Sequence, residues 1–270
     1  MRPYPVVLSI AGSDCSGGAG IQADIKTISA LGGYAASAIT AITVQNTLGV
    51  QHVEAVSPQI VRDQIEAVIS DLHPEAIKIG MVNDIATIRV IAHCLQKHQP
   101  RLVVYDPVMV STSGHQLMAS EAIREIKEVL FPLTTLITPN LHEVAVLCDR
   151  PISSQEEMLQ AAQELSVQFR TSVLVKGGHL PGNEMCDVLH ALDGKSCIYR
   201  GKKIESRNLH GTGCTLSSAI ATKLAQGYLP DEAIRQAKRY IEQAIAAGKD
   251  LNIGEGNGPL WHFPDSMAQK

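Results

Sequence analysis

The chain has 270 residues, of which 45% are hydrophobic and 19% are charged, which is enough apolar material to bury the core of one large α/β domain. Its 23 Lys and Arg residues against 27 Asp and Glu residues give a net charge of -4, which argues against binding to the phosphate backbone of a nucleic acid. The apolar run at residues 6–10 is too short for a signal peptide or a membrane span. We therefore expect one domain over residues 1–270, in the cytoplasm, with neither nucleic acid nor membrane as a partner.

Runs of apolar residues alternate along the chain with glycine, proline and polar turns. A first strand at residues 6–10 leads through a glycine-rich loop into a helix with apolar residues at 21, 25, 28 and 31. Further strands are expected at 36–44, 76–79, 102–105, 133–137 and 173–175. Further helices are expected at 57–69, 85–95, 120–129, 154–169, 214–226 and 231–247.

Strands that alternate with helices of this length predict right-handed crossovers and a mostly parallel sheet covered on both faces. The expected fold class is therefore α/β, with the architecture of a three-layer α/β/α sandwich. The segment 185–203 breaks the alternation, because two short strands flank the turn-forming pair Asp193-Gly194. This pattern predicts a β-hairpin at one place in the sheet.

The cysteines and histidines lack the spacing of a metal site. The cysteines at 15, 94, 148, 186, 197 and 214 include no Cys-x-x-Cys pair, and the histidines include no His-x-x-x-His pair. We expect reduced thiols, most of them buried as small apolar side chains.

The glycine-rich segment 11–20 lies where the first strand passes into a helix, a position at which open α/β sheets bind ligands. Glycine allows the backbone to approach a ligand closely, so this segment is a candidate substrate-covering loop, with an ordinary glycine-rich turn as the alternative. A Walker phosphate loop is excluded, because Gly18 and Ala19 stand where Lys and Ser or Thr are needed. No Gly-x-Gly-x-x-Gly pattern follows the first strand either.

A second glycine motif, Gly211-Thr212-Gly213-Cys214, directly precedes a predicted helix. Unpaired amides at a helix N-terminus and the positive end of its dipole form an anion hole, which suits the oxygens of a phosphoryl group in transfer. The same position is expected to favour the thiolate of Cys214. The alternative is a capped helix start with an incidental cysteine.

Two polar sites follow other predicted strands. Asn140 and Glu143 lie three residues apart on the first turn of a helix, where a carboxylate could hold Mg²⁺ through water, or where the two could form a reciprocal cap. Lys176 ends a strand beside two glycines and is a candidate phosphate-facing charge, although strand-end lysines are usually solvated.

Several motifs together resemble the hydroxymethylpyrimidine/phosphomethylpyrimidine kinases of thiamine biosynthesis. They are the segments 11–24, 45–47, 78–81, 106–109, 138–143, 176–179 and 210–215, in the order of that family, and the tail at 256–263. The resemblance implies a ribokinase-like fold, ATP and Mg²⁺ as cofactors, and a homodimer. It also implies two phosphorylations of 4-amino-5-hydroxymethyl-2-methylpyrimidine, first on the hydroxymethyl oxygen and then on the resulting phosphate.

The resemblance also assigns roles to individual residues. Gln45 would read the pyrimidine, because its amide matches an aminopyrimidine edge that presents one donor beside one acceptor. The same pocket would be lined by Asp24, Gly12, Met81 and Val108. ATP would be bound by Asn140, Thr212 and Lys176, the metal by Glu143 and Asp106, and the transferring phosphoryl group by Lys176, Gly211, Gly213 and Cys214.

Three other functions are alternatives to this interpretation. Pyridoxal or pyridoxine kinase is the nearest alternative, because a cysteine at this site can meet an aldehyde. A Cys/His hydrolase built on Cys214 and His210 would need a third, orienting group, which the sequence does not supply. A catalytically idle pyrimidine-binding regulator is disfavoured because Glu143, Lys176 and the anion-hole motif are all present.

Overall fold

The computed structural model describes residues 4–109, 118–178, 180 and 184–264. Within them, one nine-stranded sheet has the order β3-β2-β1-β4-β5-β6-β7-β8-β9. The strands are β1 (Val6–Asp14), β2 (Tyr34–Asn46), β3 (Gly49–Ala55), β4 (Ala76–Ile79), β5 (Val103–Tyr105), β6 (Leu136–Ile137), β7 (Ser172–Lys176), β8 (Glu184–His190) and β9 (Ser196–Lys202). The central strands from β2 to β7 pair in parallel, whereas β3, β8 and β9 add antiparallel edges.

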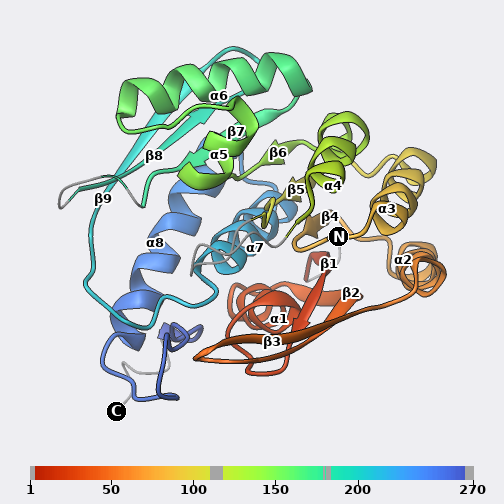
Figure 1. Cartoon of the computed structure of the whole chain (residues 1–270), viewed down its shortest axis with the longest axis horizontal. Coiled ribbons are helices and arrows are strands. Elements are labelled where there is room, and N and C mark those ends of the chain that lie inside the picture. The colour runs from red at the N-terminus through yellow and green to blue at the C-terminus, as the bar shows by residue number, and fades with distance from the viewer. Residues whose placement is uncertain (1–3, 110–117, 179, 181–183, 265–270) are drawn as a thin grey trace.

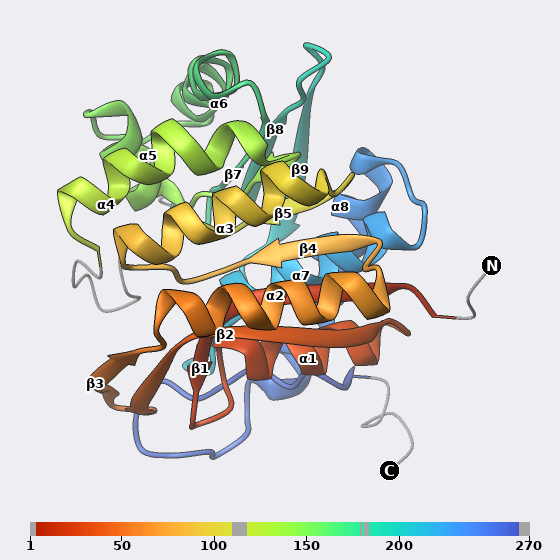
Figure 2. The ribbon, with the colours of Figure 1, turned by 90° about the vertical axis from the view of Figure 1, so that its right-hand side faces the viewer.

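Helices cover both faces of the sheet (Figures 1 and 2). They are α1 (Gly20–Ala30), α2 (Pro58–Leu72), α3 (Ile85–His98), α4 (Ser120–Glu125), which continues as a π-helix over Ile126–Leu130 and a short 3-10 turn over Phe131–Leu133, α5 (Leu141–Cys148), α6 (Gln155–Phe169), α7 (Thr212–Ala225) and α8 (Pro230–Gly248). One core lies under α2, α3, α4 and α6, and a second core lies under α1, α7 and α8. The predicted three-layer α/β/α sandwich is therefore confirmed.

The strands form these two cores because successive side chains point to opposite faces of a sheet. Leu8 and Ile10 of β1 belong to the core under α2, whereas Val7 belongs to the core under α7. Both faces of the central strands are buried, which is why these segments are almost continuously apolar.

The sequence predictions of single elements were mostly confirmed. The hairpin forms from β8 and β9, and Gly194 supplies the positive φ of +86° that its turn requires. The strand expected at 133–137 is shorter, at Leu136–Ile137, because Phe131–Leu133 forms a 3-10 turn. Strand β3 was not predicted. All six cysteines are free, as expected. Cys94 and Cys186 are fully buried, Cys148, Cys197 and Cys214 are half-buried, and Cys15 is exposed, so the prediction that most are buried is wrong.

Candidate active site

The functional residues come together at one edge of the sheet because the carboxyl ends of parallel strands face the same way. Gln45 lies at the end of β2, Met81 follows β4, and Asp106 follows β5. Glu143 lies in α5 just after β6, and Lys176 ends β7. The N-terminus of α7 meets this group, so segments far apart in the sequence form one site.

The centre of the site is an ion pair between Lys176 and Asp106. The Nζ of Lys176 lies 2.5 Å from Oδ1 of Asp106, and the Thr138 hydroxyl donates to the same oxygen at 3.1 Å. Burial acts to lower the pKa of Lys176, but the charges of Asp106 and Glu143 raise it above its ordinary value. Lys176 therefore carries a stable positive charge and is not a freely solvated strand-end lysine.

Gly213 leaves room between this ion pair and α7. A Cβ at Gly213 would lie 3.0 Å from Oδ2 of Asp106 and 3.4 Å from Nζ of Lys176. The first amides of α7 therefore approach the charged pair with no side chain in between, and amides of a first helical turn lack partners within their helix. This arrangement can hold a phosphate oxygen between the amides and the ammonium.

Cys214 does not carry the thiolate that its helix position predicted. Burial raises the pKa of the Cys214 thiol to about 11, and the nearby Lys78 charge only partly opposes that rise. The sequence prediction of a favoured thiolate is therefore wrong, because desolvation disfavours the charged form of the thiol more than the Lys78 charge favours it. The thiol is neutral at physiological pH.

Asn140 and Glu143 form the reciprocal cap that was one of the two interpretations. The Asn140 side chain accepts from the Glu143 amide at 3.0 Å, and the Glu143 carboxylate accepts from the Asn140 amide at 2.7 Å. The second carboxylate oxygen accepts from the Met109 amide at 3.3 Å. Burial raises the pKa of Glu143 to about 7. Capping does not exclude a ligand, since each oxygen retains a free lone pair.

The donor set at this point suits a magnesium ion bound to a nucleotide. The carboxyl groups of Asp106 and Glu143 both interact electrostatically with Lys176, and oxygen ligands are those that Mg²⁺ prefers. No group of three or more His, Cys, Asp or Glu side chains in the described ranges could hold a metal by itself. The remaining ligands would come from phosphate oxygens and water, as is usual for Mg²⁺.

The other half of the site lies around Gly12. A Cβ at Gly12 would lie 2.6 Å from Cε of Met81, so the absence of a side chain allows Met81 to pack against β1. Gln45 is half-buried and stands at a bulge in β2, and Val108 is half-buried after β5. Met81, Val108 and Gln45 are therefore each partly accessible at this edge of the sheet.

Asp24 was expected to line the pyrimidine pocket, but the structure places it in the interior. It has no exposed surface and lies 2.8 Å from Nζ of Lys78, which is also fully buried. Its carboxylate further accepts from the hydroxyls of Ser9 at 2.5 Å and Ser218 at 2.7 Å. The structure thus places Asp24 beneath the site, where it joins β1, β4 and α7 to α1.

Sequence reasoning missed Asp14 as an organiser of the glycine-rich loop. Its carboxylate accepts from the amides of Ser16, Gly18 and Ala19, at 2.9, 3.2 and 2.8 Å, and from Nε2 of His210 at 2.9 Å. Burial acts to raise its pKa, but these hydrogen bonds lower it to about 2. The Asp-x-Ser pattern that favours such turns was the available signal.

The two glycine motifs pack against each other. Gly211 has a φ of +86°, and a Cβ there would lie 1.8 Å from the carbonyl oxygen of Gly18. A Cβ at Gly18 would lie 2.5 Å from Cδ2 of His210. Gly211 is therefore required for close backbone approach and Gly18 for the packing of the His210 ring, and the loop after β1 is joined to the start of α7.

The family model for phosphomethylpyrimidine kinase matches residues 14–261 of this sequence. The chain belongs to the phosphomethylpyrimidine kinase family. A hydroxymethylpyrimidine/phosphomethylpyrimidine kinase from Rhizobium meliloti is 51% identical over 96% of this chain and 97% of its own. This family membership confirms the resemblance found in the motifs.

Solved structures of two kinases share the fold of this family member. A phosphomethylpyrimidine kinase from Clostridium difficile 630 is 44% identical, with a TM-score of 0.80 over 90% of this chain and all of its own. The ADP complex of Bacillus subtilis pyridoxal kinase is 31% identical, with a TM-score of 0.88 over 98% of this chain and 99% of its own. The fold is ribokinase-like, as predicted.

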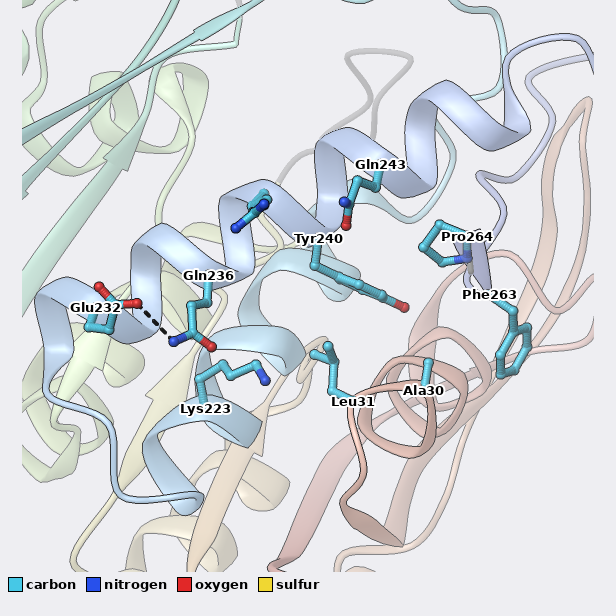
Figure 3. A pocket seen from close by; sticks show the side chains of 10 residues that line it. Ala30, Leu31, Lys223, Glu232, Gln236, Tyr240, Gln243, Phe263 and Pro264 are labelled. Carbon is cyan, nitrogen blue, oxygen red and sulfur yellow. Dashed lines mark hydrogen bonds between the residues drawn. The ribbon is translucent and has the colours of Figure 1, made fainter. Parts of the chain in front are cut away.

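A cavity of about 400 Å³ lies away from the site, between α1, α7, α8 and the segment before residue 265 (Figure 3). It is lined by Ala30, Leu31, Lys223, Glu232, Gln236, Arg239, Tyr240, Gln243, Phe263 and Pro264. Its position at the C-terminal ends of α1 and α7 separates it from the strand ends that carry the site.

Among the helices described here, none has the length and apolar character needed to cross a membrane.

Proposed function

We propose that this protein transfers phosphoryl groups from ATP to 4-amino-5-hydroxymethyl-2-methylpyrimidine and then to its monophosphate, in thiamine biosynthesis. The observation that carries the proposal is that the Lys176–Asp106 pair faces the start of α7, where Gly213 leaves no side chain in between. The chain also matches a bifunctional kinase along nearly its whole length. Phosphoryl transfer depends on positioning and charge neutralisation, and both are available at this point.

We assign the phosphate half of the site to backbone amides and one ammonium. Gly211, Gly213 and Cys214 form the anion hole through their amides, and Lys176 stabilises charge on the transferring group. Asn140 and Thr212 bind ATP at the flanks of this hole. Because the thiol of Cys214 is neutral, its side chain does not act as the base.

Asp106 and Glu143 would hold Mg²⁺ in this scheme. When bound, the ion neutralises charge on the phosphates of ATP. The residues of the chain itself fix the geometry: Thr138 and Lys176 hold Asp106, and the amides of Asn140 and Met109 hold Glu143. Both carboxylates are thus oriented before any ligand arrives, which lowers the cost of binding it.

The pyrimidine half is formed by Gln45, Gly12, Met81 and Val108. We infer that the Gln45 amide pairs with the amino group and the adjacent ring nitrogen, while Met81 and Val108 contact the faces of the ring. Asp24 would not contact the substrate. Its bonds to Lys78 and Ser218 would instead fix the position of α7 relative to the sheet.

Pyridoxal kinase is the second candidate, because the pyridoxal kinase of Bacillus subtilis has the same fold over almost the entire chain. Its identity of 31% is well below the 51% of the pyrimidine kinase from Rhizobium meliloti. The test supplies purified protein with Mg-ATP and either hydroxymethylpyrimidine or pyridoxal, and resolves the products by mass. Both the monophosphate and the diphosphate of the pyrimidine are expected. A phosphorylated product from pyridoxal alone would overturn the proposal.

We also propose that the protein forms a homodimer through the ribbon of β2 and β3. Ile42 and Val44 of β2 are 53% and 48% exposed, and β3 is an exposed edge strand. Exposed apolar side chains along an edge are typical of an interface.

We also propose a single domain over residues 1–270, which the one continuous sheet supports. The cytoplasmic location of the protein stays a prediction.

A further inference from the structure

The main chain of Gln45 is fixed by the glycine-rich loop. The pairing of β2 with β3 shifts register between Val44 and Gln45, which marks a β-bulge, and bulges beside active sites redirect side chains. The Cys15 thiol donates to the Gln45 carbonyl at 3.1 Å, and the Gln45 amide lies 3.4 Å from the same sulfur. The side chain of Gln45 therefore starts from a defined backbone position.

The two ends of the Gln45 side-chain amide have different neighbours. Its Nε2 position lies 3.0 Å from Nε2 of His210, and its Oε1 position lies 3.3 Å from the hydroxyl of Thr43. That hydroxyl already donates its only hydrogen to the Ser13 carbonyl at 2.9 Å, so it can only accept from Gln45.

His210 supplies a second constraint, because its Nε2 also lies 2.9 Å from Oδ2 of Asp14. The same Oδ2 accepts from the amides of Gly18 and Ala19, and Oδ1 accepts from the Ser16 amide, so this carboxylate is surrounded by donors and accepts only. The Nε2 of His210 must therefore carry a hydrogen, and it cannot face an amide NH₂, which also only donates.

Both neighbours require the same orientation of the amide. The Nε2 of His210 has one hydrogen, which it shares between the Asp14 carboxylate and the oxygen of Gln45 in a three-centre hydrogen bond, so that oxygen must face His210. The NH₂ group must then face Thr43, where it donates. Side-chain amide oxygen and nitrogen are assigned from their hydrogen-bond partners, and here the partners agree. One acceptor position on the oxygen and one hydrogen on the nitrogen then remain for a ligand.

The His210 ring is itself held in place. Its main-chain amide donates to the Gly258 carbonyl at 3.1 Å, and Gly18 packs against the ring so closely that a Cβ would lie 2.5 Å from Cδ2. The His210 side chain is 14% exposed and that of Asp14 is 3% exposed. The imidazole therefore acts as a fixed donor whose single Nε2 hydrogen is shared between two acceptors.

We propose that His210 is a specificity-determining positioning residue, which fixes the Gln45 amide so that the site accepts a 4-aminopyrimidine and rejects its 4-oxo analogue. This inference rests on the proposed function. In the aminopyrimidine the amino group donates and the adjacent ring nitrogen accepts, which matches the fixed amide. In the 4-oxo analogue the carbonyl accepts and the ring N–H donates, which is the reverse order, and a buried polar edge left mispaired weakens binding strongly.

The test compares kcat/KM for 4-amino-5-hydroxymethyl-2-methylpyrimidine and for its 4-oxo analogue in three proteins. Wild type should prefer the amino substrate. His210→Met removes the donor, so the amide can rotate, and the preference should fall by about tenfold while the KM for ATP stays unchanged. His210→Gln places an N–H near the former Nε2 and should restore most of the preference.

His98→Met is the matched control, since Nε2 of His98 lies 2.8 Å from Oε2 of Glu66 in a similar histidine–carboxylate pair between α2 and α3. It should leave the preference unchanged. A preference that survives in His210→Met, or that falls equally in His98→Met, overturns the proposal. So does a fall in His210→Met that comes only from a lower kcat with both substrates.

A measurement on the unmodified protein is independent of activity. The ¹⁵N chemical shifts of His210, assigned by their loss in His210→Gln, should show a protonated Nε2, and the Gln45 NH₂ should exchange with solvent faster in His210→Met. A bare Nε2 would overturn the proposal. Absence of any pyrimidine phosphorylation would instead end the proposed function, while these two NMR readouts would still decide the role of His210.

Discussion

At the scale of single residues, Cys214 could act in two ways: as a base through its thiolate, or as a hydrogen-bond donor through its backbone amide. Burial raises the pKa of this thiol to about 11, so it is protonated at pH 7 and is a poor base. We expect Cys214→Ser to slow both phosphorylations by the same factor, because the serine keeps the amide of the anion hole. Rates of the two steps, measured separately, check this. A much larger loss on the hydroxymethyl substrate than on the monophosphate would restore the thiolate as base.

Glu143 predicts a pH dependence of stability in the metal-free protein. Its pKa is about 7 in the folded state against 4.5 ordinarily, so between these values the folded protein binds more protons than the unfolded chain. The free energy of unfolding therefore falls as pH rises from about 4.5 to 7. Glu143→Gln removes this effect, and the variant should gain on the order of 3 kcal/mol relative to wild type by pH 8.

Urea denaturation of both proteins at several pH values, without Mg²⁺, checks this prediction. Gln retains an oxygen to accept from the Asn140 amide, so the cap of α5 should persist. Glu66 serves as a control, because hydrogen bonds from Lys97 and His98 lower its pKa. Its contribution to the pH dependence of the free energy of unfolding should therefore have the opposite sign. A difference between wild type and Glu143→Gln that does not change with pH would show that Glu143 is ionised throughout.

At the scale of elements, the Asp24–Lys78 pair joins α1 to β4 beneath the site. Both side chains are fully buried, so Lys78→Met leaves the Asp24 carboxylate uncompensated among Ser9 and Ser218. We expect a loss of about 3 to 5 kcal/mol in the free energy of unfolding. Lys97→Met is the control, since its ion pair with Glu66 is half-exposed and should contribute less than about 1 kcal/mol.

Denaturant titrations of both lysine variants provide the measurement. A loss in Lys78→Met no larger than in Lys97→Met would mean that the buried pair is replaceable by apolar packing. The double variant Asp24→Leu/Lys78→Met should recover part of the loss, because it removes both charges together.

At the scale of the whole molecule, the ribbon of β2 and β3 is an exposed edge of the sheet that carries apolar side chains. Ile42→Glu/Val44→Glu places two charges on its exposed apolar side chains and should convert the proposed dimer into a monomer of 29.0 kDa. Sedimentation equilibrium of wild type and variant checks this. A wild-type protein that is already monomeric, or a variant that remains dimeric, would show that this ribbon is not the interface.

Local sequence determined the elements and several of their ends. The Asp193-Gly194 pair predicted the turn of the hairpin, and alternation of apolar runs with helices predicted the parallel sheet, because both signals depend on neighbours in the chain. Strand β3 gave no such signal, because it is exposed along its whole length and carries no apolar period. Its place in the sheet follows from pairing with β2.

The motifs predicted candidate site residues, whereas the tertiary structure determined their hydrogen bonds and ionisation. A helix N-terminus predicted a reactive thiolate at Cys214, and burial by distant segments reversed that prediction. His210 and Asp14 are 196 residues apart, so no local pattern could reveal that one orients the other. Hydrogen bonds and desolvation depend on distance in space, whereas sequence patterns report only neighbours along the chain. This is why the sequence could propose candidate residues but not their ionisation states or hydrogen-bond partners.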